Sequence, residues 1–103
     1  MSPPTKRPAA GEVAGGSSLG AASERMMLMR AFGQKLRQLR HAAGLTPDSL
    51  AHKSQVSPAR ISSAENGRKE PSLSLILKLC DGLEVTPNEL IGDLPIAQER
   101  RRG

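Results

Sequence analysis

The side chains with the clearest chemical potential in this sequence are basic, and they are concentrated in one part of the chain. Residues 25–69 hold nine Lys or Arg against two acidic residues, a balance of +7. Residues 70–94 hold one Lys against five acidic residues, a balance of −4, and residues 95–103 add +2. A basic surface of this kind is the electrostatic signature of nucleic-acid binding. We therefore predict that the first part faces double-stranded DNA and that the acidic part faces away from it.

Patterns typical of catalysis or metal binding are missing from the sequence. Its one cysteine, Cys80, cannot form an internal disulfide, and His41 and His52 have no acidic or cysteine partner at metal-ligand spacing. We find no nucleophile elbow, phosphate-binding loop or carboxylate pair. The sequence predicts a protein that is not an enzyme and uses no cofactor. Cys80 fits a core position better than a redox switch, and both histidines are expected to be exposed.

The length and composition predict one small domain. The chain has 103 residues, 37% of them hydrophobic, with one Phe and no Trp or Tyr. The longest uninterrupted apolar stretch, from Met26 to Met29, is far shorter than the roughly 20 residues that cross a bilayer. No secretory signal pattern is visible. We therefore expect a cytoplasmic, nucleoid-associated protein without membrane contact.

The basic residues must be positioned by helices, because the apolar residues follow a helical period. In the first predicted helix they recur at spacings of four, three and four: Phe32, Leu36, Leu39 and Ala43. This helix ends at Gly44, and it begins either at a Ser23 cap or near Arg30. The methionines at 26, 27 and 29 either extend the core or form a contact surface, and we favour the core.

One local pattern occurs three times and reads each time as a helix start. An aliphatic residue precedes Thr or Ser, and Pro follows, in the segments 45–47, 56–58 and 85–87. The hydroxyl caps a backbone N–H, Pro suits the first helical position, and the aliphatic residue packs on the following turn. Glu89 completes a capping box with Thr86, and Pro71-Ser72 marks a fourth start. The sum is five helices between about residues 24 and 92.

Thr46 and Ser57 lie 11 residues apart. This spacing leaves room for about two helical turns, a tight turn and a new helix, so the two helices must cross steeply. That arrangement is the helix-turn-helix unit, whose second helix is presented to a major groove.

At this point the sequence resembles a family, the Cro and phage-repressor type helix-turn-helix domains, also called the XRE family. The resemblance spans Phe32 to Ile91, about 60 of the 103 residues. The matching runs are Leu36-Arg37-Gln38-Leu39-Arg40, Gly44-Leu45-Thr46, Leu50-Ala51, Val56-Ser57, Ile61-Ser62, Glu65-Asn66-Gly67-Arg68, Pro71-Ser72-Leu73, Leu83-Glu84-Val85 and Leu90-Ile91. The resemblance implies a compact, all-α, five-helix repressor-like fold that binds operator DNA as a homodimer and regulates transcription.

The resemblance also implies roles for individual residues. The helix from Ser57 to Asn66 would lie in the major groove, with base contacts from Pro58, Ala59, Arg60, Ser62 and Ser63. Phosphate contacts would come from Arg37, Arg40, Thr46, Lys53, Asn66, Arg68, Lys69 and Ser72. Arg40 would also pair with Glu65, although both residues also fit as ordinary surface charges.

Three residues depart from the family pattern. Pro47 replaces a phosphate-binding Gln, and Ser54 replaces a residue that is commonly apolar. Gln55 stands where the family prefers Gly, so a left-handed backbone there costs about 1 kcal/mol. The outward face of the recognition helix is also short-chained, since only Arg60 can make a bidentate contact to guanine. Specificity is therefore expected to depend partly on DNA shape or on the tails.

We divide the chain into a disordered tail (1–23), a DNA-binding domain (24–94) and a basic C-terminal tail (95–103). Lys6 and Arg7 are either a DNA-binding arm or part of a plain leader, which we favour. Arg100 to Arg102 either hold phosphates or are simply solvated. The dimer interface is predicted at Leu90, Ile91, Leu94 and Ile96, because these side chains expose more aliphatic area than a short last helix buries by itself.

The predicted function is a sequence-specific transcriptional regulator, such as a repressor, that binds a palindromic operator as a homodimer. The alternative is a protein-interaction module, an antitoxin or bridging factor, in which the acidic half and the tails hold a protein partner and DNA binding is secondary.

Overall fold

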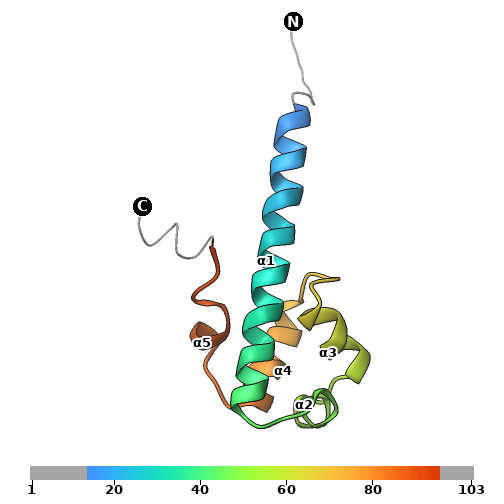
Figure 1. Ribbon diagram of the computed structural model, residues 1–103, viewed down its shortest axis with the longest axis vertical. Coiled ribbons are helices and arrows are strands. Elements are labelled where there is room, and N and C mark those ends of the chain that lie inside the picture. The colour runs from blue at the N-terminus through green and yellow to red at the C-terminus, as the bar shows by residue number, and fades with distance from the viewer. Residues whose placement is uncertain (1–13, 96–103) are drawn as a thin grey trace, which may run out of the picture.

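The structure, a computed structural model, describes residues 14–95, and of residues 14–22 it describes the backbone alone. Five helices follow one another along these residues: α1 (Ala14–Ala42), α2 (Pro47–Ser54), α3 (Pro58–Glu65), α4 (Leu73–Leu83) and α5 (Pro87–Ile91) (Figure 1). Residues 14–95 contain no strand. The predicted all-α, five-helix fold is confirmed.

Helix α1 is much longer than the others, and its N-terminal part projects beyond them (Figure 1). It begins at Ala14, ahead of the predicted start at Ser23 and inside the segment predicted to be disordered. An existing helix extends without a new nucleation step, so residues ahead of Ser23 join it at little cost. Met26 and Met27 are 52% and 56% exposed, which makes the predicted core position wrong for both.

The three repeated helix starts have the predicted cap geometry. Thr46 Oγ1 accepts from the Ser49 N–H at 3.1 Å, and Ser57 Oγ accepts from the Arg60 N–H at 3.2 Å. Thr86 Oγ1 accepts from the Glu89 N–H at 3.2 Å, and the Thr86 N–H donates to the Glu89 carboxylate at 2.8 Å. The aliphatic residue before each cap packs against the core. These caps set where α2, α3 and α5 begin.

The residue before each of these aliphatic positions has a left-handed backbone and ends the preceding helix. Gly44, Gln55 and Glu84 have φ values of 72°, 59° and 59°. In each case the next N–H reaches back to a carbonyl five residues earlier at 3.0 Å, for example from Val56 to Ala51. This is the Schellman motif, which satisfies the last carbonyls of a helix. The left-handed conformation predicted for Gln55 is present, and that of Glu84 was not anticipated.

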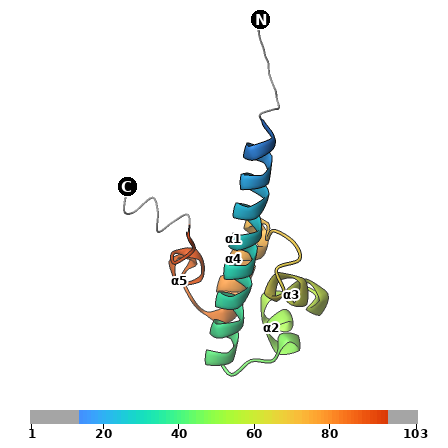
Figure 2. The same cartoon turned by 45° about the horizontal axis from the view of Figure 1, so that its top comes forward.

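The core lies where α1, α2, α3, α4 and α5 meet. Its most fully buried large side chains come from all five helices: Leu36, Leu50, Ile61, Leu79 and Leu90. Cys80 is buried with them, whereas His41 and His52 are exposed, as predicted. Figures 1 and 2 show α3 and α5 on opposite sides of α1, which separates α3 from the end of the domain.

The predicted dimer interface needs a correction at Leu90. This side chain has 0% exposure because the short α5 turns it inward onto the core, so it is unavailable to a second chain. Ile91 and Leu94 are half-buried and pack against the core. Ile96 lies outside the described residues, as do Lys6, Arg7 and the run Arg100 to Arg102.

Candidate nucleic-acid interface

Helix α3 presents an exposed outward face and an apolar inward face. Ile61 and Ala64 are buried against α1 and α2. The residues predicted to read bases lie on the other face, where Pro58, Ala59, Arg60 and Ser62 are exposed and Ser63 is half-buried. No other described element covers this face, so α3 has the presentation that a groove-reading helix requires.

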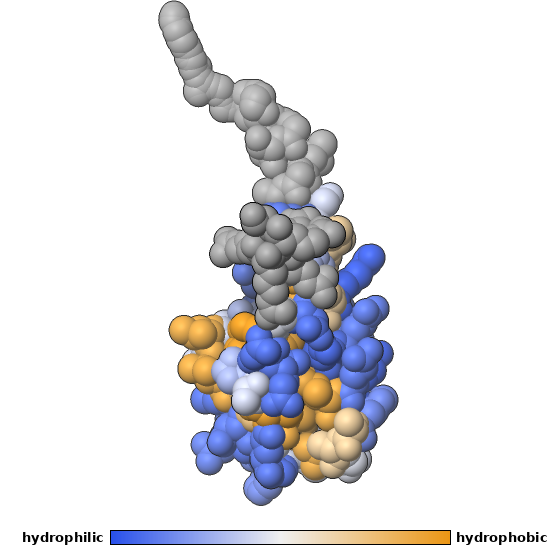
Figure 3. Space-filling model, turned by 90° about the vertical axis from the view of Figure 1, so that its left-hand side faces the viewer, coloured by the Kyte–Doolittle hydropathy of each residue, from blue (hydrophilic) through white to orange (hydrophobic). Residues whose placement is uncertain are grey.

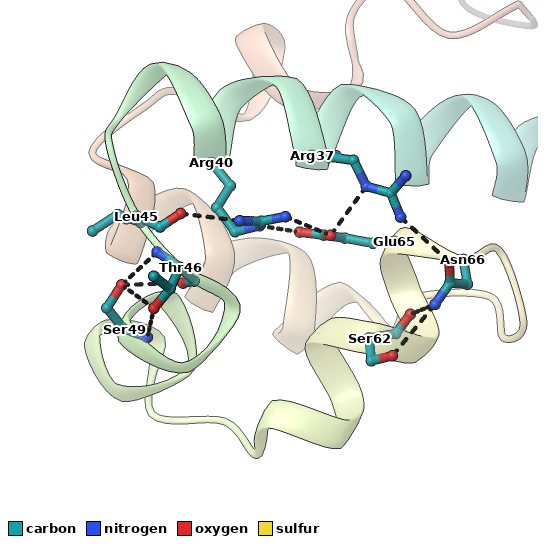
Figure 4. Close-up of polar contacts among 8 residues, drawn as sticks. All are labelled: Arg37, Arg40, Leu45, Thr46, Ser49, Ser62, Glu65 and Asn66. Carbon is teal, nitrogen blue, oxygen red and sulfur yellow. Dashed lines mark hydrogen bonds and ion pairs between the residues drawn. The ribbon is translucent and has the colours of Figure 1, made fainter.

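The C-terminal end of α3 is fixed to α1 by an ion pair. Arg40 Nε lies 2.6 Å from one Glu65 carboxylate oxygen, and Arg40 Nη2 lies 3.1 Å from the other. Arg40 Nη1 donates to the Leu45 carbonyl at 3.0 Å (Figure 4). The two side chains are only 9% and 5% exposed. The hydrogen bond to Glu65 raises the pKa of the Arg40 guanidinium, so this guanidinium stays charged.

The same burial bears on the second role predicted for Arg40. Three of its nitrogen atoms are already engaged, and the residue as a whole is 7% exposed. Most of the guanidinium is enclosed by protein, so Arg40 acts first as a positioning residue for α3, and the phosphate contact predicted for it stays a prediction.

Arg37, one turn earlier on α1, makes a second connection to α3. Its Nε lies 3.4 Å from Glu65 Oε1, and its Nη2 donates to Asn66 Oδ1 at 3.3 Å. The Arg37 side chain remains 48% exposed. Asn66 Nδ2 in turn donates to the Ser62 carbonyl at 2.9 Å and to Ser62 Oγ at 3.3 Å. No sequence pattern predicts this link, because it depends on how α1 and α3 cross.

A glycine allows α1 and α3 to approach so closely. A Cβ at Gly33 would collide with the backbone carbonyl oxygens of Ala64 and Glu65. Backbone atoms cannot rotate out of the way as a side chain can, so any larger residue would push α3 away from α1. Gly33 therefore sets how closely α3 packs against α1, and the Arg40–Glu65 pair fixes the C-terminal end of α3.

A shallow groove of about 350 Å³ runs between α3 and the start of α4. Its lining includes the predicted DNA contacts Arg60, Ser63, Lys69 and Ser72, together with one acidic residue, Glu70. Arg68, Lys69 and Ser72 are all exposed. The groove joins the outward face of α3 to the loop that holds three of the eight predicted phosphate contacts, Arg68, Lys69 and Ser72.

The remaining predicted phosphate contacts are placed differently. Thr46 and Asn66 are exposed at the start of α2 and the end of α3. Lys53 lies near the end of α2, where its Nζ is 3.1 Å from the Glu84 carboxylate at the end of α4. The Glu84 carboxylate offsets the positive charge with which Lys53 would bind a phosphate, so Lys53 is the weakest of the predicted phosphate contacts.

Cys80 and Ser54 are buried groups with no part in this interface. Burial raises the pKa of the Cys80 thiol, and the charge of Glu89 raises it further. Ser54 is 3% exposed, and its hydroxyl has no hydrogen-bond partner. It packs against Gly82, where a Cβ would collide with the Ser54 hydroxyl.

Among the described side chains, which are those of residues 23–95, no three or more His, Cys, Asp or Glu lie together as a metal site. No helix in the described part of the chain has the length and apolar character needed to span a membrane.

Comparison with known proteins bears on the same region. Residues 31–90 match a family model described as "Helix-turn-helix domain". A Bacillus subtilis protein named "Uncharacterized HTH-type transcriptional regulator RghRB" is 44% identical over 64 residues, which cover 61% of this chain and 46% of that protein. The match thus spans less than half of the length of that relative.

Two solved structures share the fold of this region. The restriction-modification controller protein C.AhdI from Aeromonas hydrophila is 40% identical, with a TM-score of 0.59, over 60% of this chain and 94% of its own. The clp gene regulator ClgR from Corynebacterium glutamicum is 37% identical, with a TM-score of 0.57, over 65% of this chain and 91% of its own.

Proposed function

The chain belongs to the helix-turn-helix transcriptional regulators of the XRE family, and from this premise we propose that it reads a palindromic operator as a homodimer. Helix α3 enters the major groove, and no enzymatic step is involved. The site of action would be the nucleoid, in the cytoplasm.

The observation that supports this proposal best is the exposed outward face of α3, held from behind by buried contacts. Ile61 and Ala64 anchor its inner face, and the Arg40–Glu65 pair anchors its end. A base contact requires such rigidity, because a bidentate hydrogen bond tolerates little displacement. Arg60 is the one long donor on the exposed face and is our candidate for a guanine contact.

Phosphate binding is assigned to the exposed groups that border α3. These are Arg37, Thr46, Asn66, Arg68, Lys69 and Ser72, with Lys53 in a lesser role. Contacts of this kind fix the register of the helix in the groove and provide affinity for any sequence. The acidic residues Asp81, Glu84, Glu89 and Asp93 are exposed on α4, on α5 and just after them. This distribution favours one orientation toward a duplex, with α3 leading.

Two copies are proposed because one domain of this size reads only a few base pairs. Among the described large apolar residues, Leu73 on α4 is the most exposed at 73%, and Leu77, one turn later on the same helix, is 51% exposed. We assign Leu73 and Leu77, together with the half-buried Ile91 and Leu94, to the contact with the second copy in place of Leu90. Figure 3 shows apolar side chains on the face of the molecule that bears α5.

The charges beside Leu77 suit a second copy. Lys78 and Asp81 are exposed and take part in no ion pair within the described residues. Across a two-fold axis each Lys78 would face the partner's Asp81, so that both pairs form at once. Sedimentation of Leu77→Asp beside the wild type tests this surface. We expect a wild-type dimer and a folded monomeric variant, and a wild type that stays monomeric at high micromolar concentration would exclude dimerisation.

Selection of bound sequences from a random duplex pool tests the function itself. We expect one enriched motif with two-fold symmetry and half-sites about one helical turn apart. Enrichment of an asymmetric motif would contradict the proposed homodimer, and binding without any enrichment would contradict the proposed sequence-specific regulation.

A second candidate is a protein-interaction module, an antitoxin or bridging factor. The observation in its favour is the short outward face of α3, where Pro58, Ala59 and Ser62 offer little hydrogen bonding to bases. A DNA reader is expected to combine steep salt dependence with a large ratio of specific to non-specific affinity. Salt dependence without such a ratio would favour a protein partner instead.

A further inference from the structure

The amide of Asn66 has its orientation fixed from two sides (Figure 4). Arg37 Nη2 carries only hydrogens, so the atom 3.3 Å away must be the amide oxygen. The Ser62 carbonyl only accepts, so the atom 2.9 Å from it must be the amide nitrogen. Either contact alone would settle which end of the amide is which, and the two agree. Asn66 therefore turns its NH₂ group toward Ser62.

This orientation determines how Ser62 can use its hydroxyl. Asn66 Nδ2 lies 3.3 Å from Ser62 Oγ and has only hydrogens to offer, so Ser62 accepts. A serine hydroxyl has a single hydrogen, and this hydrogen is not spent on Asn66. Ser62 is exposed on the outward face of α3, where its hydrogen is available to a group outside the protein.

The geometry points to Asn66, held by Arg37, as a positioning residue that keeps Ser62 a hydrogen-bond donor toward the major groove. In the groove, the acceptors are N7 and O6 of guanine, N7 of adenine and O4 of thymine, whereas cytosine offers a donor at N4. Ser62 thereby selects, at one position of each half-site, a base that presents an acceptor. This inference rests on the proposed function, since it concerns the base preference of α3.

The substitution Asn66→Asp reverses the polarity of the contact. A carboxylate only accepts, so residue 66 no longer donates to the Ser62 carbonyl or hydroxyl, and the contact that remains uses the Ser62 hydrogen and leaves only lone pairs for the duplex. The preferred base at that position should then change to one that presents a donor, the N6 amino group of adenine or the N4 amino group of cytosine.

The experiment is selection from a random duplex pool with four proteins: wild type, Asn66→Asp, Ser62→Ala and the double variant. We expect the wild type and Asn66→Asp to prefer different bases at one position of each half-site, and all other positions to agree. Ser62→Ala should lose the preference at that position. Asn66→Asp should then have no further effect in the Ser62→Ala background, which separates the polarity effect from the added negative charge.

Arg37→Gln supplies a second variant in case Asn66→Asp unfolds, which circular dichroism would reveal. Without the guanidinium, the Asn66 amide loses one of the two contacts that fix it, and the preference at the Ser62 position should weaken while the others stay. If the wild type enriches no motif, the proposed function is contradicted, and this inference is contradicted with it. A clear wild-type motif that Asn66→Asp or Arg37→Gln leaves unchanged would overturn this inference alone.

Discussion

Arg40 and Glu65 face each other through two parallel hydrogen bonds, from Nε at 2.6 Å and from Nη2 at 3.1 Å, with both side chains almost fully buried. The pair links the C-terminal end of α3 to α1. Removal of either side chain leaves the charge of the other side chain buried without a partner.

We expect Glu65→Ala to lower the free energy of unfolding by about 3–5 kcal/mol, the usual cost of stranding one member of a buried pair. Urea unfolding followed by circular dichroism measures this. Glu84→Ala is the matched control, because it removes an exposed pair with Lys53 and should cost less than about 1 kcal/mol. Arg40→Met with Glu65→Leu should be milder than Glu65→Ala alone, and equal losses for Glu65→Ala and Glu84→Ala would contradict the structural role.

The left-handed residues predict stability changes of opposite sign. Gln55→Gly should stabilise the protein by about 0.5–1 kcal/mol, because Gly tolerates a φ of 59° that costs other residues about 1 kcal/mol or more. Gly44→Ala should destabilise it by about 1 kcal/mol. Its φ is 72° and an added Cβ would meet no atom within 4 Å, so conformation alone decides the effect. Thermal unfolding of both variants checks the pair, and a stabilised Gly44→Ala would contradict the Schellman assignment.

Much of the fold follows from the sequence because its signals are local. The caps at Thr46, Ser57, Ser72 and Thr86 act within three residues, so helix starts can be read from the sequence alone. The family pattern prefers Gly at the position of Gln55, and this preference predicts the left-handed backbone that Gln55 adopts.

The features that sequence reasoning missed depend on contacts between distant segments. The full burial of Leu90 depends on how α5 docks, and the Arg37–Asn66 bond depends on the crossing of α1 and α3 that Gly33 permits. Glu84 adopts a left-handed backbone although Glu does not favour it. The clue was present, since Glu84 precedes Val85-Thr86-Pro87 just as Gln55 precedes Val56-Ser57-Pro58.

We expect replacement of the buried Ser54 by Ala to stabilise the protein. Its hydroxyl is buried without a partner, so Ser54→Ala removes a desolvated polar group and should raise the free energy of unfolding by about 1–3 kcal/mol. The matched control is Ser49→Ala. The Ser49 hydroxyl accepts from the Thr46 N–H at 2.8 Å, so its removal should destabilise by about 1 kcal/mol. A destabilised Ser54→Ala would mean that this hydroxyl is satisfied in solution.

We expect the burial of the Cys80 thiol to make the protein lose stability at alkaline pH. Because burial raises the pKa of its thiol in the folded protein, the thiol's contribution is complete below the unfolded value of about 8.5 and is lost as the pH rises through the folded value. Urea unfolding between pH 7 and 10 should show a steeper decline for the wild type than for Cys80→Ala. An aromatic disulfide reagent should react with the thiol only after unfolding, and rapid reaction with the native protein would contradict the burial.

The measurement that tests the central claim most directly is base discrimination by Arg60→Ala, compared with Lys69→Ala, on single-base variants of the selected operator. If the outward face of α3 reads sequence, Arg60→Ala loses about 1–3 kcal/mol of discrimination at one position of each half-site. Lys69→Ala instead weakens binding to every duplex alike and lowers the salt dependence. An Arg60→Ala protein that keeps the wild-type base preferences at every position would contradict the account.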